Sequence, residues 1–148
     1  MGESQRVREE RTGWRDDSLS ERHRMWGWDC PMIDVDFLAV EYDVSRPVAL
    51  VEYKNEHARP VLATDQSRKV LARLGDMAGL PSFLARYASS FEWFRVGGIN
   101  ACAKDRLGAV QKTFSELEWV DFLYGLRGRS TPDNVAVKIE ALHAQASR

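Results

Sequence analysis

Two short stretches of the chain place acidic side chains and a lysine at the spacing of a strand. Glu52 and Lys54 are two positions apart in VALVEYK, and Asp34 and Asp36 are two positions apart in IDVDF. Side chains two residues apart on a β-strand point to the same face. If the stretches pair as a hairpin whose turn centres near Val44, Asp36 lies across from Glu52 and Asp34 across from Lys54, with Cβ atoms about 5 Å apart. Because carboxylates this close repel each other unless a cation lies between them, the pattern predicts a cation site.

The chemistry of this set is that of metal-assisted phosphodiester hydrolysis. Mg²⁺ or Mn²⁺ suits oxygen ligands, and Mg²⁺ usually keeps several waters, so Asp36 and Glu52 supply enough protein charge. Asp34 is a further candidate ligand, and the backbone carbonyl of Tyr53 is another. Lys54 would stabilise developing negative charge or help to orient the nucleophile. A solvated strand face remains the structural alternative, although two aspartates on one strand are disfavoured without a functional reason.

The pattern D-(x)n-E-x-K across a hairpin, with a helix before and after it, resembles the PD-(D/E)XK nuclease superfamily. The resemblance covers about residues 18–96, and DFLAV…VALVEYK looks most like Holliday-junction-resolvase-type members and small phage or bacterial restriction-like proteins. It implies that Asp36 and Glu52 are catalytic metal-binding acids and that Lys54 is the catalytic lysine. The chain departs from the pattern because no proline immediately precedes either aspartate, and Asp34 also qualifies as the first acid.

Weaker assignments follow around the hairpin. The resemblance implies that Glu21 matches an acidic residue on the preceding helix, and that Gln66 matches a polar residue on the following helix. Arg22 and Arg24 are candidate nucleic-acid contacts because arginine forks match phosphates, and His57 could contact a phosphate. The alternatives stay open: Glu21 as a capping residue, the arginines as a solvated helix face, and His57 as a loop residue.

Composition bounds these hypotheses. The chain has 148 residues, of which 44% are hydrophobic and 29% charged, as is typical of one globular domain. The net charge of −1 is unlike that of a protein that coats nucleic acid, so any such contact must come from a local group of charges. No apolar run is long enough for a bilayer, and the N-terminus is charged from Glu3, so we expect a cytoplasmic protein without a membrane partner. The cysteines and histidines are too scattered to predict a structural zinc site.

Periodicity predicts the elements that position the site. We expect an arm at 1–17, a nuclease-like domain at 18–128, and a linker with a C-terminal helix at 129–148. A capping box of Ser18 with Glu21 should start a helix over 19–26, with Gly27 closing it. Strands should follow over 31–42 and 48–54, a helix from Thr64 to Gly79, and strands over 80–87 and 91–96, with a short helix from Pro81 as the alternative for 80–87. Residues 97–113 show no clear periodicity and are a loop or a helix or strand with a weak signal. A helix capped by Ser115 and Glu118 follows, and a second helix near Pro132 completes the chain.

The predicted order is therefore α-β-β-α-β-β-α-α, an α/β (α+β) fold with a mixed central sheet flanked by helices and, by resemblance, a restriction-endonuclease-like core. We expect Trp93 and Trp119 in the core, with Trp26 or Trp28 as a further anchor. The stripe of Leu117, Val120, Leu123 and Tyr124 should pack. The C-terminal stripe of Val135, Ile139 and Leu142 should pack or form a dimer contact.

The leading functional hypothesis is a metal-dependent nuclease, most simply a DNA endonuclease. The alternative is a catalytically inactive module of the same fold that binds nucleic acid or a protein partner. A third reading is a small scaffold protein whose acidic face aids solubility. The resemblance also allows a homodimer, because resolvase-like nucleases are often dimers.

Overall fold

The computed structural model describes residues 17–27 and 29–148. The chain divides into two compact units, Met1–Asp34 and Val35–Arg148, and each is described by itself. The first unit holds α1, Asp17–Met25, and the turn after it has Gly27 at a φ of +92°. Because α1 already begins at Asp17, Ser18 lies in its first turn, and the predicted capping box of Ser18 and Glu21 is wrong. Apart from Asp17, the predicted arm lies outside the described residues.

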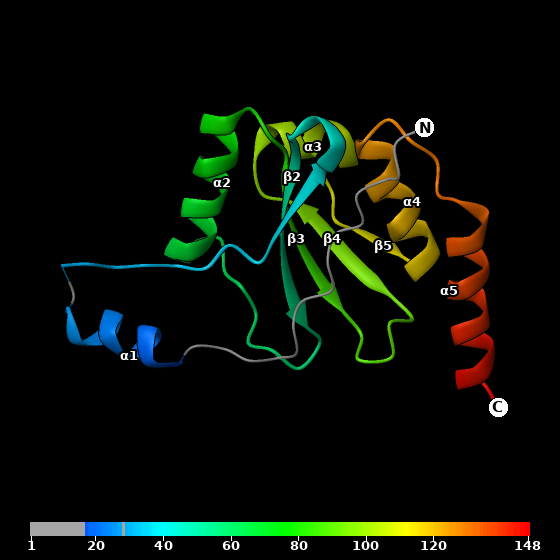
Figure 1. The fold of residues 1–148 in the computed structure, drawn as a ribbon, viewed down its shortest axis with the longest axis horizontal. Helices are drawn as coiled ribbons and strands as arrows, with labels where there is room; N and C mark the ends of the chain where they lie inside the picture. Colours follow the sequence, from blue (N-terminus) through cyan, green and yellow to red (C-terminus); the bar gives the residue numbers. More distant parts are fainter. Residues whose placement is uncertain (1–16, 28) are drawn as a thin grey trace. The chain divides into compact units, whose positions relative to one another are not determined.

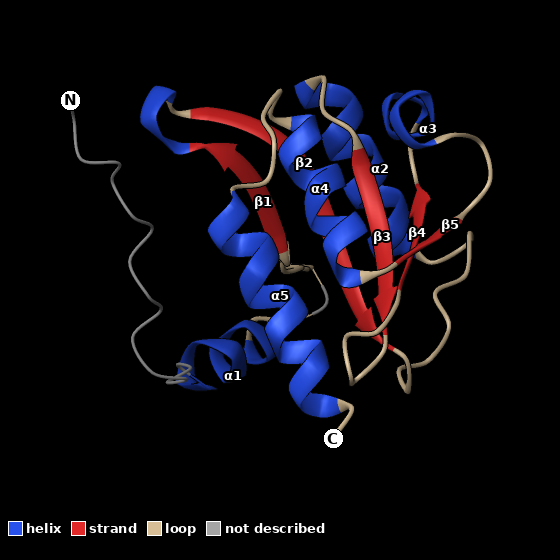
Figure 2. Cartoon of the chain, turned by 90° about the vertical axis from the view of Figure 1, so that its right-hand side faces the viewer, coloured by secondary structure: helices blue, strands red, loops and turns tan. Residues whose placement is uncertain are grey.

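The second unit is a five-stranded mixed sheet with helices on both sides. The strands lie in the order β1-β2-β3-β4-β5; β2 and β3 are parallel, and the other neighbours are antiparallel. Figure 1 shows α2 on one side of the sheet and α4 and α5 on the other, and in Figure 2 α5 lies outside α4. The predicted α/β architecture is confirmed at this level. The bounds are β1 Phe37–Glu41, η1 Tyr42–Val44, β2 Arg46–Asn55, α2 Gln66–Ala78, β3 Ser82–Tyr87, β4 Phe94–Gly98, α3 Ala101–Leu107, β5 Lys112–Phe114, α4 Glu116–Leu126 and α5 Asp133–Ala146.

The predicted element order lacks α3 and β5, which occupy most of the stretch read as a loop. Asn100 is the N-cap of α3, and its side-chain oxygen accepts a hydrogen bond from the Ala103 N–H at 2.9 Å. Because α3 has seven residues and β5 has three, neither is long enough to show a recognisable hydrophobic period in the sequence.

The main core lies between the sheet and α4. Trp119 is only 2% exposed, and Phe83 is fully buried. The predicted capping box of Ser115 and Glu118 is present and starts α4 one turn before Trp119. Trp119 is confirmed as a core residue, whereas Trp93 is only half-buried. Trp26, which we expected as an anchor, is 52% exposed, and Trp28 lies outside the described residues.

The helix α2 begins later than predicted and packs closely on the start of β3. Its N-cap is Asp65, not Thr64, and the Asp65 carboxylate accepts from the Leu62 N–H, which stabilises the turn before the helix. Gly75 faces the sheet where a Cβ atom would lie 2.1 Å from the Ser82 hydroxyl oxygen. The helix ends at Gly79, as predicted, with a φ of +71°.

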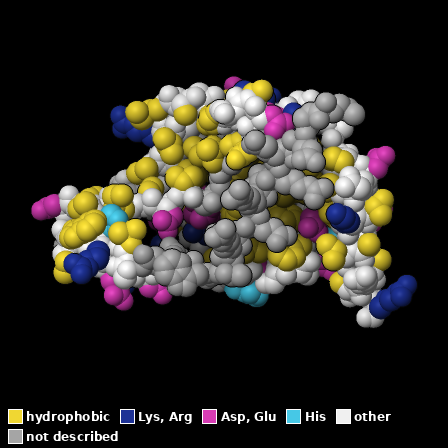
Figure 3. All heavy atoms as spheres, viewed as in Figure 1, with side chains coloured by type: hydrophobic (Ala, Val, Ile, Leu, Met, Phe, Trp, Pro, Cys, Tyr) yellow, Lys and Arg dark blue, Asp and Glu magenta, His cyan; other side chains and the backbone are white. Residues whose placement is uncertain are grey.

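The strand β1 forms one edge of the sheet and carries exposed apolar side chains. Phe37 is 61% exposed and Leu38 is 47% exposed. Figure 3 shows hydrophobic side chains gathered on the face of the molecule that β1 occupies. At the other end of the chain, Ile139 of α5 is buried, and Leu142 is 61% exposed. None of the helices in the described ranges is long and apolar enough to cross a bilayer.

Candidate active site

The hairpin of β1 and β2 has the register that the sequence predicts. Phe37 pairs with Val51, Leu38 with Leu50 and Ala39 with Ala49, and the register shifts only after Ala39. One further step in the same register places Asp36 across from Glu52.

Asp36 lies immediately before β1 and ends its pairing with β2. Its Oδ2 atom accepts a hydrogen bond from the backbone N–H of Tyr53 at 3.0 Å. The carboxylate therefore takes the place of the backbone carbonyl that a longer β1 would have offered. The prediction of a strand over 31–42 is wrong at its start, since regular pairing begins at Phe37. Aspartate is disfavoured in regular strands.

Asp34 consequently has no place across from Lys54 in the ladder. Residue 34 precedes the paired segment and belongs to the first unit of the chain. The predicted pairing of Asp34 with Lys54 is therefore wrong for the described ladder, and Asp34 as a metal ligand stays a prediction.

Glu52 and Lys54 share one face of β2, as predicted. Their side chains form an ion pair, with Lys54 Nζ 3.1 Å from Glu52 Oε1. The Lys54 side chain is 36% exposed and the Glu52 side chain is 22% exposed. Both line an open cavity of about 310 Å³ between the sheet, residues 58–61 and the first turn of α2. Gln66, the first residue of α2, lines the same cavity. The structure thus brings Gln66 together with Glu52 and Lys54.

Tyr53 faces the opposite side of the sheet. Its hydroxyl oxygen accepts a hydrogen bond from the Trp119 indole N–H at 3.0 Å, and burial raises the pKa of the Tyr53 phenol. The N–H and C=O groups of a strand residue point to the same neighbour. Because the Tyr53 N–H reaches Asp36, the Tyr53 carbonyl oxygen faces the same edge of β2.

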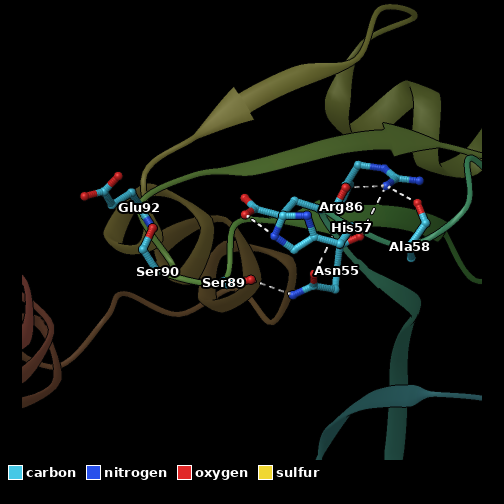
Figure 4. Close-up of polar contacts among 8 residues, drawn as sticks. Asn55, His57, Ala58, Arg86, Ser89, Ser90 and Glu92 are labelled. Atoms are coloured by element: carbon cyan, nitrogen blue, oxygen red, sulfur yellow. Dashed lines mark hydrogen bonds and ion pairs between the residues drawn. The ribbon is translucent and has the colours of Figure 1, made fainter.

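Arg86 holds the loop that forms one wall of the cavity, and the sequence did not predict this role. Its guanidinium donates to the carbonyl oxygens of Asn55, Glu56, Ala58 and Arg59 at distances of 2.9–3.2 Å. Figure 4 shows Arg86 reaching toward Asn55, at the end of β2, and the loop that carries His57 and Ala58. The only sequence signal is an arginine within the otherwise mostly apolar segment SFLARY.

Of the remaining predicted contact residues, His57 lies outside the cavity lining, and the other three belong to the first unit. The His57 ring is 2.9 Å from Glu56 Oε1, its side chain is 80% exposed, and it does not line the cavity. Glu21, Arg22 and Arg24 occupy exposed positions on α1, within the first unit. His23, between these arginines, packs edge-on against Trp26 with the ring centroids 4.5 Å apart.

The hairpin carries oxygen atoms of the kind that a hard divalent cation takes as ligands. The described ranges hold no group of three or more His, Cys, Asp or Glu side chains suited to a metal. The oxygens available are the carboxylates of Asp36 and Glu52 and the carbonyl of Tyr53. Two carboxylates, a carbonyl and waters are ligands that Mg²⁺ accepts, whereas zinc favours nitrogen and sulfur.

Comparisons of the chain with protein-family models, with curated proteins and with solved structures found no match. The functional assignment therefore rests on the chemistry of the hairpin and its surroundings.

Proposed function

We propose that the protein is a metal-dependent nuclease that hydrolyses phosphodiester bonds at the β1–β2 hairpin, with nucleic acid, most simply DNA, as its substrate. The supporting observation is the hairpin itself. Asp36 approaches the backbone of Tyr53, and the side chains on either side of Tyr53 form an ion pair at the mouth of an open cavity. This arrangement agrees with the D-(x)n-E-x-K resemblance.

Each residue has a distinct role in this proposal. Asp36, Glu52 and the Tyr53 carbonyl would hold Mg²⁺ or Mn²⁺, which when bound supplies Lewis-acid chemistry to the phosphodiester. Lys54 donates hydrogen bonds to a phosphate oxygen and stabilises the negative charge that develops there. Its ion pair with Glu52 holds the ammonium group at the cavity before substrate arrives. Gln66 lines the same cavity and can orient a phosphate oxygen or a water through its amide.

A second candidate is a catalytically inactive module of the same type, and one observation favours it. Asp36 already has a structural role as the acceptor for the Tyr53 N–H. In such a module the hairpin would bind neither metal nor a reacting phosphate.

The proposal is tested by incubating the protein with single-stranded, duplex and branched DNA in the presence of Mg²⁺ or Mn²⁺. We expect cleavage of at least one substrate that stops when EDTA is added. A Mn²⁺ titration followed by thermal unfolding separates the candidates, because an ion that binds only the folded state raises its stability. Stabilisation that disappears in Glu52→Gln supports the nuclease; no stabilisation of the natural protein supports the inactive module.

A further inference from the structure

The face of the sheet that carries Glu52 and Lys54 continues as a row of cations. Lys54 pairs with Arg86 across β2 and β3, and Arg86 pairs with Arg95 across β3 and β4. Directly paired residues lie on the same face of a sheet. The row crosses two strand spacings, about 10 Å. B-DNA places one phosphate on each strand per about 3.4 Å of its axis, so the row is long enough to contact more than one phosphate of a strand.

A second cavity, of about 240 Å³, lies beside the first and is lined by Arg86 and Arg95 of this row. Three arginines, Arg68, Arg86 and Arg95, line it together with the Gln111 amide, and no acidic residue does. The two cavities have wall residues in common, so they adjoin each other; these are Pro60, Val61, Arg68, Leu84 and Ile99.

The positive charge of this second cavity is not neutralised within the described part of the chain. Arg86 donates only to neutral carbonyl groups. Neither Arg68 nor Arg95 has a carboxylate within ion-pair distance among the described residues. The Arg95 guanidinium lies 4.5 Å from the centre of the Trp93 ring, which holds the group without removing its charge. In a chain with a net charge of −1, this is a local site for an anion.

Gly97 keeps the floor of the second cavity open. A Cβ atom built at Gly97 meets no atom within 4 Å, whereas one at the next residue, Gly98, would lie 2.9 Å from the Lys104 backbone nitrogen. A larger side chain at position 97 would therefore enter the cavity rather than collide with the protein.

We propose that the second cavity binds a phosphate of the same nucleic-acid strand that enters the Glu52–Lys54 cavity, through Arg68, Arg95 and the charge of Arg86. The proposal rests on the proposed function because it assigns the neighbouring phosphate of that substrate. Two adjoining phosphate sites would hold the strand across the sheet from β2 to β4.

The test measures binding without metal, so that it does not depend on cleavage. A fluorescein-labelled single-stranded DNA oligonucleotide, and its duplex, are titrated with protein in EDTA and followed by fluorescence anisotropy. Loss of one charge-assisted phosphate contact should weaken binding about tenfold in Arg68→Ala and in Arg95→Ala. Each should also lower the slope of log K against log salt by about one. Gly97→Leu, which keeps every charge, should weaken binding by filling the cavity.

Arg73→Ala is the matched control, because Arg73 is exposed on α2 and lines neither cavity. It should bind as the natural protein does. Natural-strength binding by Arg68→Ala, Arg95→Ala and Gly97→Leu overturns the proposal even if the protein cleaves DNA, as does an absence of binding by the natural protein. Weakened binding in a protein that cleaves nothing supports the phosphate site and refutes the nuclease. A mononucleotide or inorganic phosphate that binds as tightly as the oligonucleotide would overturn the assignment to a strand.

Discussion

The two faces of the central sheet have opposite chemistry. On the α4 side, aromatic rings from the strands pack on the helix. The Trp119 ring stacks on Phe94 of β4 at a centroid distance of 6.2 Å and on Phe122 of α4 itself at 5.7 Å. On the α2 side, neighbouring positions of the same strands carry Lys54, Arg86 and Arg95 in register. Because side chains alternate along a strand, one set of strands builds an apolar core on one face and an open, charged surface on the other.

This comparison separates stability from function. The α4 face should hold most of the folding free energy, because it removes the largest apolar area from water. The open part of the α2 face should tolerate substitution without unfolding, and its changes should appear in binding and cleavage. Substitutions on the two faces should therefore differ in their effect on the free energy of unfolding.

Removal of the central ring of the α4 face should be the most damaging change. Trp119→Ala empties a site that is 2% exposed and removes the hydrogen bond to the Tyr53 hydroxyl, so we expect a loss of about 4 kcal/mol in the free energy of unfolding. Urea denaturation measures it. Trp93→Ala, at a half-buried position on the other face, is the control and should lose clearly less. Equal losses would contradict the separation of the faces.

A methyl group added where α2 packs closely should destabilise the fold by overpacking. In Gly75→Ala the new Cβ atom would lie 2.1 Å from Ser82 Oγ and 2.8 Å from the Leu80 carbonyl oxygen, and we expect a loss of about 2 kcal/mol. Gly97→Ala adds the same group to an open part of that face and should change stability little. Both are measured by urea denaturation; a tolerated Gly75→Ala would show that α2 can move away from the sheet.

Acid should weaken the attachment of β1 to α4. The Glu41 carboxylate accepts from Arg127 Nε at 2.5 Å and lies 2.8 Å from Arg129, and the hydrogen bond with Arg127 holds the pKa of Glu41 below 4.5. With a lowered folded-state pKa, the contribution of Glu41 to stability is complete above pH 4.5 and is lost as pH falls through the folded pKa. The unfolding midpoint in urea, followed from neutral to acidic pH, should therefore fall less steeply in Glu41→Gln. An unchanged pH profile in that variant would contradict this role.

Substitutions at the hairpin cavity should affect stability least. Because the Glu52–Lys54 pair is partly exposed, Glu52→Gln and Lys54→Ala should each change the free energy of unfolding by less than about 1 kcal/mol. Urea denaturation of the two variants checks this. A loss near that of Trp119→Ala would mean that the pair is part of the fold rather than of the site.

The sequence predicted the part of the site that depends on alternation. Phe37 and Ala39 fall on one face of the first predicted strand, as Val51 and Tyr53 do on the second, so the register of the hairpin followed from the pattern. The same pattern extended the first strand too far, to residue 31, because it does not show that the Asp36 carboxylate ends the pairing by bonding the Tyr53 N–H.

Features that depend on distant partners were not predictable. Arg86 contacts carbonyl groups 27 to 31 residues away in the chain, and nothing in SFLARY indicates them. In the sequence, Glu41 is only the polar residue at the end of a predicted strand. Its partner Arg127 lies 86 residues later, so the pattern does not indicate the ion pair. Gln66 was proposed by resemblance alone, and its position at the cavity depends on the packing of α2.

The most direct test of the nuclease proposal is the rate of Mg²⁺- or Mn²⁺-dependent DNA cleavage by the natural protein, Glu52→Gln and Glu56→Gln. Glu56 is the matched control because it lies four residues along the same segment, pairs with His57 and does not line the cavity. We predict cleavage by the natural protein and by Glu56→Gln, with a rate at least about 100-fold lower for folded Glu52→Gln. Undiminished cleavage by Glu52→Gln, or none by the natural protein on any DNA substrate, would contradict the assignment.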